Sequence, residues 1–373
     1  MPRDVWRTSD VCRSCNSLSG LFVAAAFIRS WMGKAELSRG SLEYLAGKPL
    51  PGKAKVVAIP LDFYGPIQNV PVPDGCVAEY WSGPCGANII HIRPESGDEQ
   101  WTAYAGGDPR AKKSDAGRAY MALTSEERFW VLVSLASFQK HFDRAERYVV
   151  NMEIPVDWPF KSPDKSDPRQ GKDMGTVDAV IAASRAGTLI HTRPIIRFDL
   201  GNRMLARLGL AVGYKILGPA FLETEYAKHL RRAFREANPQ RRRNIPVRGS
   251  GFLNQRGIGG AEAILSWPGG WVLMTNIVEE SLMLSVIAPS GRSMTAMVCD
   301  DAALISGLGA QYRNGVVWIT VPAAQHAVGP ILLPAYLAHQ TNVRAHSDLT
   351  ALASTRGNPK MLPPCHPSGH GPR

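Results

Sequence analysis

The sequence contains no hydrophobic run long enough to cross a membrane. A membrane-spanning helix needs about 20 consecutive apolar residues, and the longest apolar stretch near the N-terminus, residues 21–28, stops much sooner at Arg29. No signal-peptide cleavage site follows it. We therefore expect no membrane partner and no secretory leader.

Cysteine is also scarce, with 6 residues in a chain of 373. Small secreted domains depend on a dense framework of disulfides, which so few cysteines in so long a chain do not supply. We expect a reducing compartment and a cytoplasmic location. The common nucleotide-binding motifs are missing too, because the glycines at 249, 251, 257, 259 and 260 fit neither a P-loop nor the dinucleotide fingerprint.

Acidic residues are too few to balance the basic ones. The chain has 43 Lys and Arg against 32 Asp and Glu, a formal net charge of +11. Such an excess is typical of proteins that bind nucleic acid, because contacts with phosphates release counterions, although many basic proteins bind none. Charge alone makes DNA a candidate partner without deciding the matter.

The composition and the hydrophobic patterns predict an α+β fold, with antiparallel sheets and packed helices in two domains. Hydrophobic residues make up 45% and charged residues 20%, as in ordinary globular proteins. The spacing of hydrophobic residues and the positions of turn-forming residues predict helices at residues 129–142, 177–186, 202–217 and 221–237. They predict strands at residues 56–59, 76–81, 89–92, 101–104, 148–154, 263–267, 271–276, 282–288, 293–299 and 316–321.

Proline and charge set the expected boundaries. Residues 1–47 are expected to form a cysteine-containing lead and a helix, and residues 48–156 an α+β domain. The Pro-rich, charged segment 157–174 is expected to be a linker. Residues 175–341 are expected to hold helices followed by an antiparallel β meander, and the polar segment 342–373 a disordered tail.

The clearest electrostatic feature is a basic cluster in and after the predicted helix 221–237. In that helix Leu222, Tyr226, Leu230 and Phe234 recur at every fourth position and predict a core face. The cations fall largely off this stripe, and arginine is well suited to bind phosphate. A solvated helix face with a basic loop explains the pattern equally well. The candidate nucleic-acid-binding residues are Lys228, Arg231, Arg232, Arg235, Arg241, Arg242, Arg243 and Arg248.

The sharpest short motif is Cys12-Arg13-Ser14-Cys15-Asn16. Two thiolates separated by two residues can hold one Zn²⁺, but a structural zinc site needs four ligands. The motif supplies half of such a site, and Cys76 and Cys85 could add the rest. Two free cysteines in a short loop are the simpler alternative.

Cys12, Cys15 and Asn16, followed by a helix, resemble the last third of the zinc-containing HNH endonuclease motif. The segments around 202–210 and 218–221 also look like the helical region that follows this module in some bacterial and phage proteins. The family's first zinc pair and its catalytic histidine have no counterpart here, because His91 is the first histidine of the chain. Ser19 stands where many members have lysine. We expect an N-terminally incomplete or degenerate member.

The resemblance implies metal-dependent hydrolysis of DNA, with structural Zn²⁺ on Cys12 and Cys15, and Mg²⁺ or Mn²⁺ for any activity. Asn16 is the one position that would carry over to the catalytic site, so whether the chain is an active enzyme stays open. His91, His191 and the pair Asp300 and Asp301 are weaker candidates for catalysis or metal binding. The alternative function is a non-enzymatic module that binds nucleic acid or protein.

Overall fold

The structure is a computed structural model, and it describes residues 27, 31–45, 58–95, 116–152, 158–193, 198–249 and 264–357. Two compact units share the chain. Within the described residues, unit 1 comprises residues 27, 39–45, 198–249 and 264–357, and unit 2 comprises residues 31–38, 58–95, 116–152 and 158–193. The division falls within helix α3 (Trp31–Leu45).

Unit 2 is built on a five-stranded sheet in the order β1-β2-β3-β4-β5. The first three pairings are antiparallel, and β4 pairs with β5 in parallel after the helix α4. The elements are β1 (Asp62–Pro66), β2 (Cys76–Ser82), β3 (Asn88–Pro94), β4 (Arg118–Ala122), α4 (Arg128–His141), β5 (Glu146–Val149) and α5 (Pro168–Arg185).

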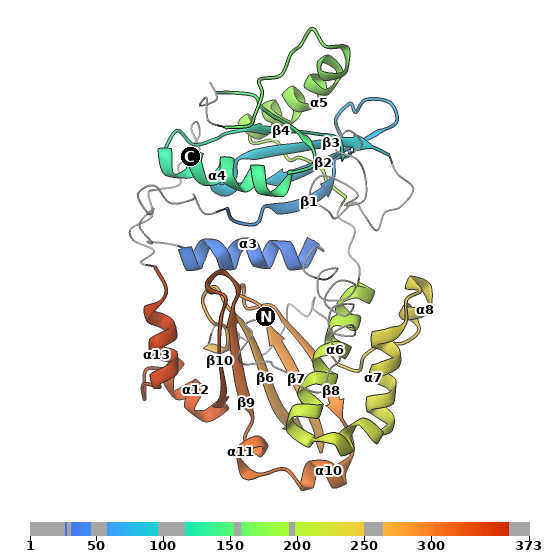
Figure 1. Cartoon of the computed structure of the whole chain (residues 1–373), viewed down its shortest axis with the longest axis vertical. Coiled ribbons are helices and arrows are strands. Elements are labelled where there is room, and N and C mark those ends of the chain that lie inside the picture. The colour runs from blue at the N-terminus through green and yellow to red at the C-terminus, as the bar shows by residue number, and fades with distance from the viewer. Residues whose placement is uncertain are drawn as a thin grey trace. The chain divides into compact units, whose positions relative to one another are not determined.

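Both faces of this sheet are covered, because successive side chains point to opposite sides of a strand. One face carries Ile89, Met121 and their neighbours in a core with Leu135 and Phe138 of α4. The other face carries Ile90, Ile92 and Tyr120 in a core with Met174 and Val177 of α5. Figure 1 shows α4 and α5 beside the sheet of this unit.

Unit 1 is built on an antiparallel sheet in the order β10-β9-β6-β7-β8. Its strands are β6 (Trp271–Val278), β7 (Ser281–Ile287), β8 (Ser293–Cys299), β9 (Val316–Val321) and β10 (His326–Leu332). Its helices, besides the end of α3, are α6 (Phe198–Leu217), α7 (Glu225–Arg235), α8 (Pro239–Arg243), α10 (Ala302–Ser306), α11 (Ala310–Arg313), α12 (Leu333–Gln340) and α13 (Ser347–Ser354).

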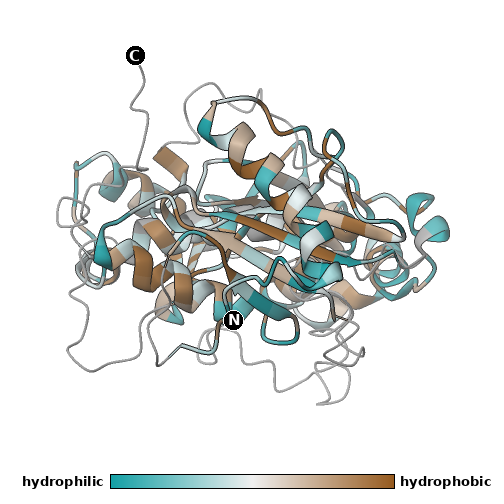
Figure 2. Cartoon of the chain, turned by 90° about the horizontal axis from the view of Figure 1, so that it is seen from above, coloured by the Kyte–Doolittle hydropathy of each residue, from teal (hydrophilic) through white to brown (hydrophobic). Residues whose placement is uncertain are grey.

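Hydrophobic patterning explains this sheet as well. Val272, Met274, Val317 and Ile319 lie in one buried core, which Tyr336 of α12 completes. Helix α6 lies against β8, and α7 lies against α6. Figure 2 colours the whole chain by hydropathy and shows hydrophobic residues along strands and on helices. No helix in the described ranges is both long and apolar enough to span a bilayer.

The α+β class with antiparallel sheets and packed helices is confirmed, but the expected boundary at 157–174 is displaced. Phe160 is buried in the core of unit 2, Lys161 hydrogen-bonds to β5, and α5 begins at Pro168. Proline at the first turn starts this helix, since its missing N–H is not needed there. The segment is therefore an integral part of unit 2.

Two further expectations need correction. The expected disordered tail contains α13, whose Leu349 and Leu352 are buried. The predicted strand 263–267 is replaced by a short turn in which Trp267 pairs with Gly270. The side chain of Glu127 caps α4, while the hydroxyl of Thr124 donates to the carbonyl of Cys85.

Candidate nucleic-acid interface

Helix α7 places the first part of the basic cluster. The side chain of Thr224 caps the helix by accepting a hydrogen bond from the Ala227 amide at 3.1 Å. Glu225 follows in the first turn, where a negative charge suits the helix dipole. Tyr226, Ala227, Leu230 and Ala233 are buried and fix the rotation of the helix.

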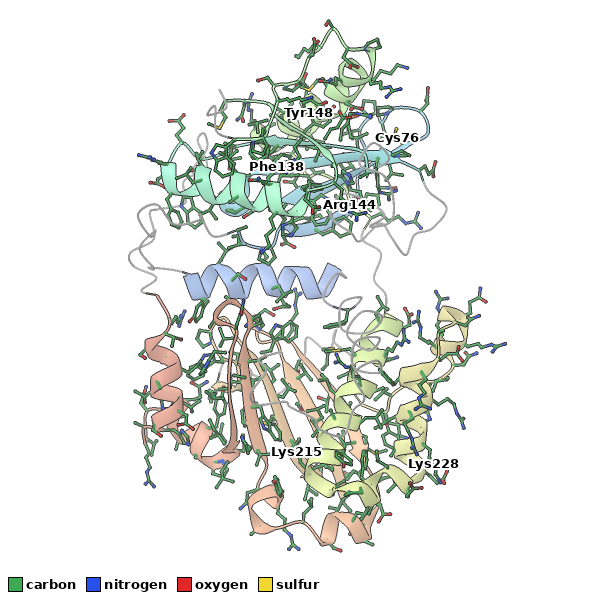
Figure 3. The ribbon with its side chains drawn as sticks, in the orientation of Figure 1. Cys76, Phe138, Arg144, Tyr148, Lys215 and Lys228 are labelled. Carbon is green, nitrogen blue, oxygen red and sulfur yellow. The ribbon has the colours of Figure 1, made fainter. Side chains whose placement is uncertain are left out.

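The opposite side of α7 carries an exposed row of cations. Lys228, Arg232 and Arg235 are exposed and follow one another at spacings of four and three residues, which places them on one face of a helix. Figure 3 shows nitrogen-tipped side chains on α7, with Lys228 pointing away from the sheet of this unit. Burial of the apolar face thus turns these charges to solvent.

Helix α8 adds exposed cations on either side of a buried one. Asn238 caps the helix by accepting from the amides of Gln240 and Arg241, and Pro239 occupies its first turn. Arg241 and Arg243 are exposed, whereas Arg242 turns inward and pairs with Asp199 of α6 at 2.9 Å. Both charged side chains of this pair are about 95% buried (5% and 6% exposed). Arg242 therefore anchors α8 and is unsuited to bind a ligand.

Two other members of the predicted cluster are engaged within the chain. Arg231 is half-buried and donates to the carbonyl of Leu222 at 2.5 Å. Arg248 pairs with Asp300 at 3.4 Å and lies over the ring of Tyr226, 5.6 Å from its centroid. The amide of Arg248 also donates to the Tyr226 hydroxyl, and its carbonyl accepts from Met297 of β8. This residue ties the segment after α8 to α7 and to the sheet.

Five cations remain on the outside of α7 and α8, and together we call them the α7–α8 surface: Lys228, Arg232, Arg235, Arg241 and Arg243. Lys228 contacts Glu225 at 2.7 Å, but both side chains are exposed, so the pair contributes little. This contact lowers the pKa of Glu225. Among the described residues, the four arginines form no ion pair with a carboxylate.

Helix α6 adds two half-buried arginines beneath this surface. Arg203 donates from Nε to the carbonyl of Phe234, in the last turn of α7, at 2.7 Å. Burial lowers the pKa of Arg203 and of Arg207, and the nearby charge of Arg242 lowers that of Arg203 further. The excess of positive charge therefore extends from α7 and α8 to the adjoining helix.

The zinc motif cannot be placed, because Cys12, Cys15 and Asn16 lie outside the described residues. Cys76 has a free thiol, whereas Cys85 is disulfide-bonded and so is not available as a zinc thiolate. Within the described ranges, no three His, Cys, Asp or Glu side chains gather closely enough to hold a metal ion.

His91 is buried in unit 2, and both of its ring nitrogens have partners. Its Nδ1 lies 3.0 Å from Oε2 of Glu79 on the adjacent strand, and its Nε2 lies 2.8 Å from the carbonyl oxygen of Ala116. Arg93 donates to Oε1 of the same glutamate at 3.0 Å. Burial raises the pKa of Glu79, but the hydrogen bond from His91 and the charges of Arg93 and His91 outweigh it, so the net pKa is lowered.

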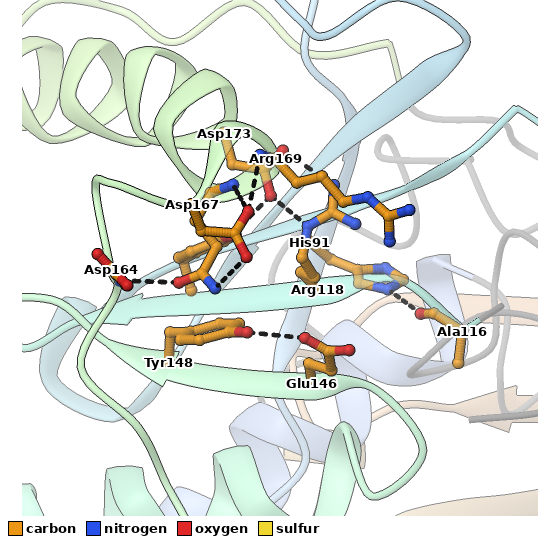
Figure 4. A network of polar contacts seen from close by, with 11 residues as sticks. His91, Ala116, Arg118, Glu146, Tyr148, Asp164, Asp167, Arg169 and Asp173 are labelled. Carbon is orange, nitrogen blue, oxygen red and sulfur yellow. Dashed lines mark hydrogen bonds and ion pairs between the residues drawn. The ribbon is translucent and has the colours of Figure 1, made fainter. Parts of the chain in front are cut away.

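A second buried network, on the other face of the same sheet, was not predicted. Asp173 of α5 accepts hydrogen bonds from both Arg118 and Tyr120 of β4. Tyr148 stacks on Tyr120, with ring centroids 5.0 Å apart, and donates to Glu146. Figure 4 shows Arg118 and Asp173 together with Tyr148 and Glu146. Asp173 lies more than 50 residues from Arg118 and Tyr120, so no local pattern in the sequence relates it to them.

These groups do not form a reactive site. Desolvation raises the pKa of Tyr120 and of Tyr148, and hydrogen bonds to the carboxylates raise it further. Both phenols therefore stay protonated and donate to their carboxylates. The hydrogen bond to Asp173, the largest effect, raises the pKa of Arg118 against the opposing effect of burial. The network joins α5 to the sheet.

The remaining candidates also have structural roles. His191 is exposed, and its backbone groups hydrogen-bond to Gln68 and Asn69. Asp301 caps α10 by accepting from the amides of Ala303 and Leu304. Asp300 pairs with Arg248.

Comparison with known proteins gives no family. No protein-family model matches the chain, and no curated protein or solved structure matches it significantly. Functional interpretation therefore depends on the described residues themselves.

Proposed function

We propose that this chain binds nucleic acid through the α7–α8 surface. The observation that supports the proposal is the exposure of five cations on two adjacent helices, four of them arginines without an acidic partner in the described residues. These four arginines are not engaged in ion pairs with carboxylates of the described chain. They are free to pair with an external polyanion.

The chemistry of the side chains favours phosphate as the target. A guanidinium is planar, always charged and able to donate two parallel hydrogen bonds to a phosphate. Several such contacts spread over two helices suit a ligand with repeated phosphates. Nucleic acid has this chemistry along its whole backbone.

An anionic membrane fits the surface less well. Helices that lie on membranes insert large apolar side chains beside their cations. The exposed large hydrophobic residues in the described part of the chain are Tyr64, Leu189, Ile264, Val278, Leu332 and Val343, and none belongs to α7 or α8. The surface therefore offers charge without an inserting face.

The test is the binding of a fluorescent DNA duplex, followed by anisotropy, for the wild type and two variants with equal loss of charge. Arg232→Ala/Arg235→Ala changes the surface, and Arg169→Ala/Lys172→Ala removes two exposed cations from α5 of unit 2. We expect the first variant to bind at least about tenfold more weakly and the control to bind almost as the wild type, because each phosphate contact contributes separately.

Equal weakening of DNA binding in the two variants would refute binding through the α7–α8 surface. It would indicate only a general effect of net charge. Binding to anionic vesicles but not to DNA would indicate that the surface binds membranes, and it would overturn the proposal. Binding to neither would overturn it as well.

Hydrolysis of DNA is a second proposal, and it is supported by the Cys12, Cys15 and Asn16 motif alone. A plasmid-nicking assay with Mg²⁺ or Mn²⁺ tests it, with Cys12→Ser/Cys15→Ser as the matched variant. Nicking by the wild type that the variant lacks would support a metal-dependent nuclease. Duplex binding without nicking would leave a binding module.

A cytoplasmic location, where nucleic acid is accessible, belongs to this proposal. Disulfides are rare in the cytoplasm of most organisms, so the disulfide bond of Cys85 is the observation that argues against this location. Labelling of Cys85 during denaturing lysis of the cells tests the location, since a cytoplasmic chain is expected to keep this thiol reduced and the buried side chain becomes accessible once the chain unfolds. Complete protection of Cys85 from labelling would contradict the cytoplasmic part of the proposal.

A further inference from the structure

We infer that the α7–α8 surface binds the backbone of a double-stranded nucleic acid in preference to a single strand. This inference rests on the proposed function and specifies its ligand. It follows from three features of the surface. Its aromatic residues are mostly buried or covered, its cations are densely spaced, and both helices are held against α6.

The first feature is the lack of a stacking platform. Proteins that bind single strands stack the bases on exposed aromatic side chains. On α7 and the turn before it, Phe221 is fully buried, Tyr226 is 5% exposed and Phe234 is half-buried. The ring of Tyr226 is covered by Arg248 and by His229, which stacks on it at 5.5 Å. Of Phe221, Tyr226 and Phe234, only Phe234 is partly exposed, so these residues offer unpaired bases little ring surface on which to stack.

The second feature is the spacing of the charges. Lys228 and Arg235 are separated by seven helical residues, which is about 10 Å along the helix axis. A duplex presents one phosphate in about every 1.7 Å of its axis and a single helical strand one in about every 3.4 Å. Each neutralised phosphate also releases more counterion from a duplex, with a slope of about 0.9 against about 0.7. A dense row of cations therefore gains more from a duplex.

The third feature is the fixed position of the two helices. The buried pair between Arg242 and Asp199 ties α8 to α6, and Arg203 ties the end of α7 to α6. His229 contacts the carbonyl of Pro246 at 2.8 Å and holds the segment after α8 against α7. Cations held in place in this way match the regularly spaced phosphates of a stiff duplex. A flexible single strand would first have to be ordered on the surface. Less conformational entropy is then lost on binding.

The experiment compares three fluorescent ligands at one salt concentration: a mixed-sequence duplex and each of its separated strands. The full-length wild-type chain and the Arg241→Ala/Arg243→Ala variant are titrated against all three, with Arg169→Ala/Lys172→Ala as the control. We expect the duplex to bind at least about tenfold more tightly than either strand, and the Arg241→Ala/Arg243→Ala variant to lose most on the duplex.

Equal or tighter binding of the single strands would overturn the inference while leaving the proposed nucleic-acid function in place. Binding of no ligand would refute the proposed function itself. A duplex preference that the Arg241→Ala/Arg243→Ala variant leaves unchanged would locate duplex recognition elsewhere and would also overturn the inference.

Discussion

The two units place their charged side chains in opposite ways. In unit 2, Glu79, His91 and Arg93 are buried against one another on one face of a sheet, and Asp173 pairs with Arg118 on the other. In unit 1, most of the cations of α7 and α8 are exposed and have no acidic partner in the described residues. Lys228 and Arg231 have partners as well, but Arg242 is the member that is buried in an ion pair, as the charges of unit 2 are.

This contrast separates structural charge from charge that is available for binding. A buried ion needs a partner, because an uncompensated charge in the interior costs several kcal/mol. An exposed cation costs little and is free to interact with a ligand. Burial and pairing, more than residue type, therefore decide which arginines of the predicted cluster can contact a phosphate.

The largest expected effect comes from removing the acid of the buried cluster in unit 2. Glu79→Ala leaves His91 and Arg93 without their shared carboxylate, so we expect a loss of up to about 5 kcal/mol in the free energy of unfolding. Glu225→Ala is the control, because this glutamate is exposed and should change stability by less than about 0.5 kcal/mol. Urea denaturation measures both, and equal losses would show that pairing in the interior does not matter here.

Two neighbouring arginines give the next test. Arg242→Ala removes the buried ion pair with Asp199, and we expect a loss of about 3 kcal/mol in unfolding free energy. Arg241→Ala changes an exposed side chain and should leave stability unchanged while weakening duplex binding. Denaturation and anisotropy on the same two proteins would separate the roles. The account fails if Arg241→Ala destabilises the fold as much as Arg242→Ala does.

A smaller effect is expected at Gly249, where the chain returns to the sheet beside α7. Its φ is +146°, and a Cβ atom there would lie 2.0 Å from the carbonyl oxygen of Thr295. Gly249→Ala should therefore lower the unfolding free energy by about 2 kcal/mol. In α5, Gly175 has open space around the position of a Cβ atom, and Gly175→Ala should stabilise by about 0.5 to 1 kcal/mol. Thermal unfolding measures both, and a change in stability of the same sign for the two substitutions would contradict this contrast.

The pH dependence of unit 2 is the most subtle test. The pKa of Glu79 lies below its ordinary value of 4.5 in the folded chain, so its ionised form stabilises the fold above that value. This stabilisation is lost as the pH falls through the folded pKa. The stability difference between the wild type and Glu79→Gln, measured by denaturation, should therefore shrink below about pH 4.5. A difference that stays constant into strong acid would rule out the assigned ionisation.

The sequence predicted the regular parts of the fold well where hydrophobic periodicity was strong. The strands at 293–299 and 316–321 begin and end as expected, and α6 ends at Leu217 as predicted. Proline misled the prediction at 157–174, because Pro168 begins a helix that packs on the sheet. Local patterns do not distinguish a proline in a linker from one in the first turn of a helix.

The sequence predicted the members of the basic cluster, but it did not predict which of them are buried in ion pairs. The basic cluster was visible in the sequence, and the stripe of Tyr226 and Leu230 correctly indicated the buried side of α7. The burial of Arg242 depends on Asp199, which lies 43 residues earlier, and no local signal predicts that contact. The same distance effect hid the network of Arg118 and Asp173.

The most direct test of the central claim is the salt dependence of duplex binding by the wild type, Arg232→Ala/Arg235→Ala and Arg169→Ala/Lys172→Ala. If the α7–α8 surface contacts phosphates, the slope of log affinity against log salt should fall by about 1.8 for the first variant, about 0.9 for each lost contact. The slope of the control should equal that of the wild type. Identical slopes for all three proteins would contradict the account, because the exposed arginines of unit 1 would then contact no phosphate.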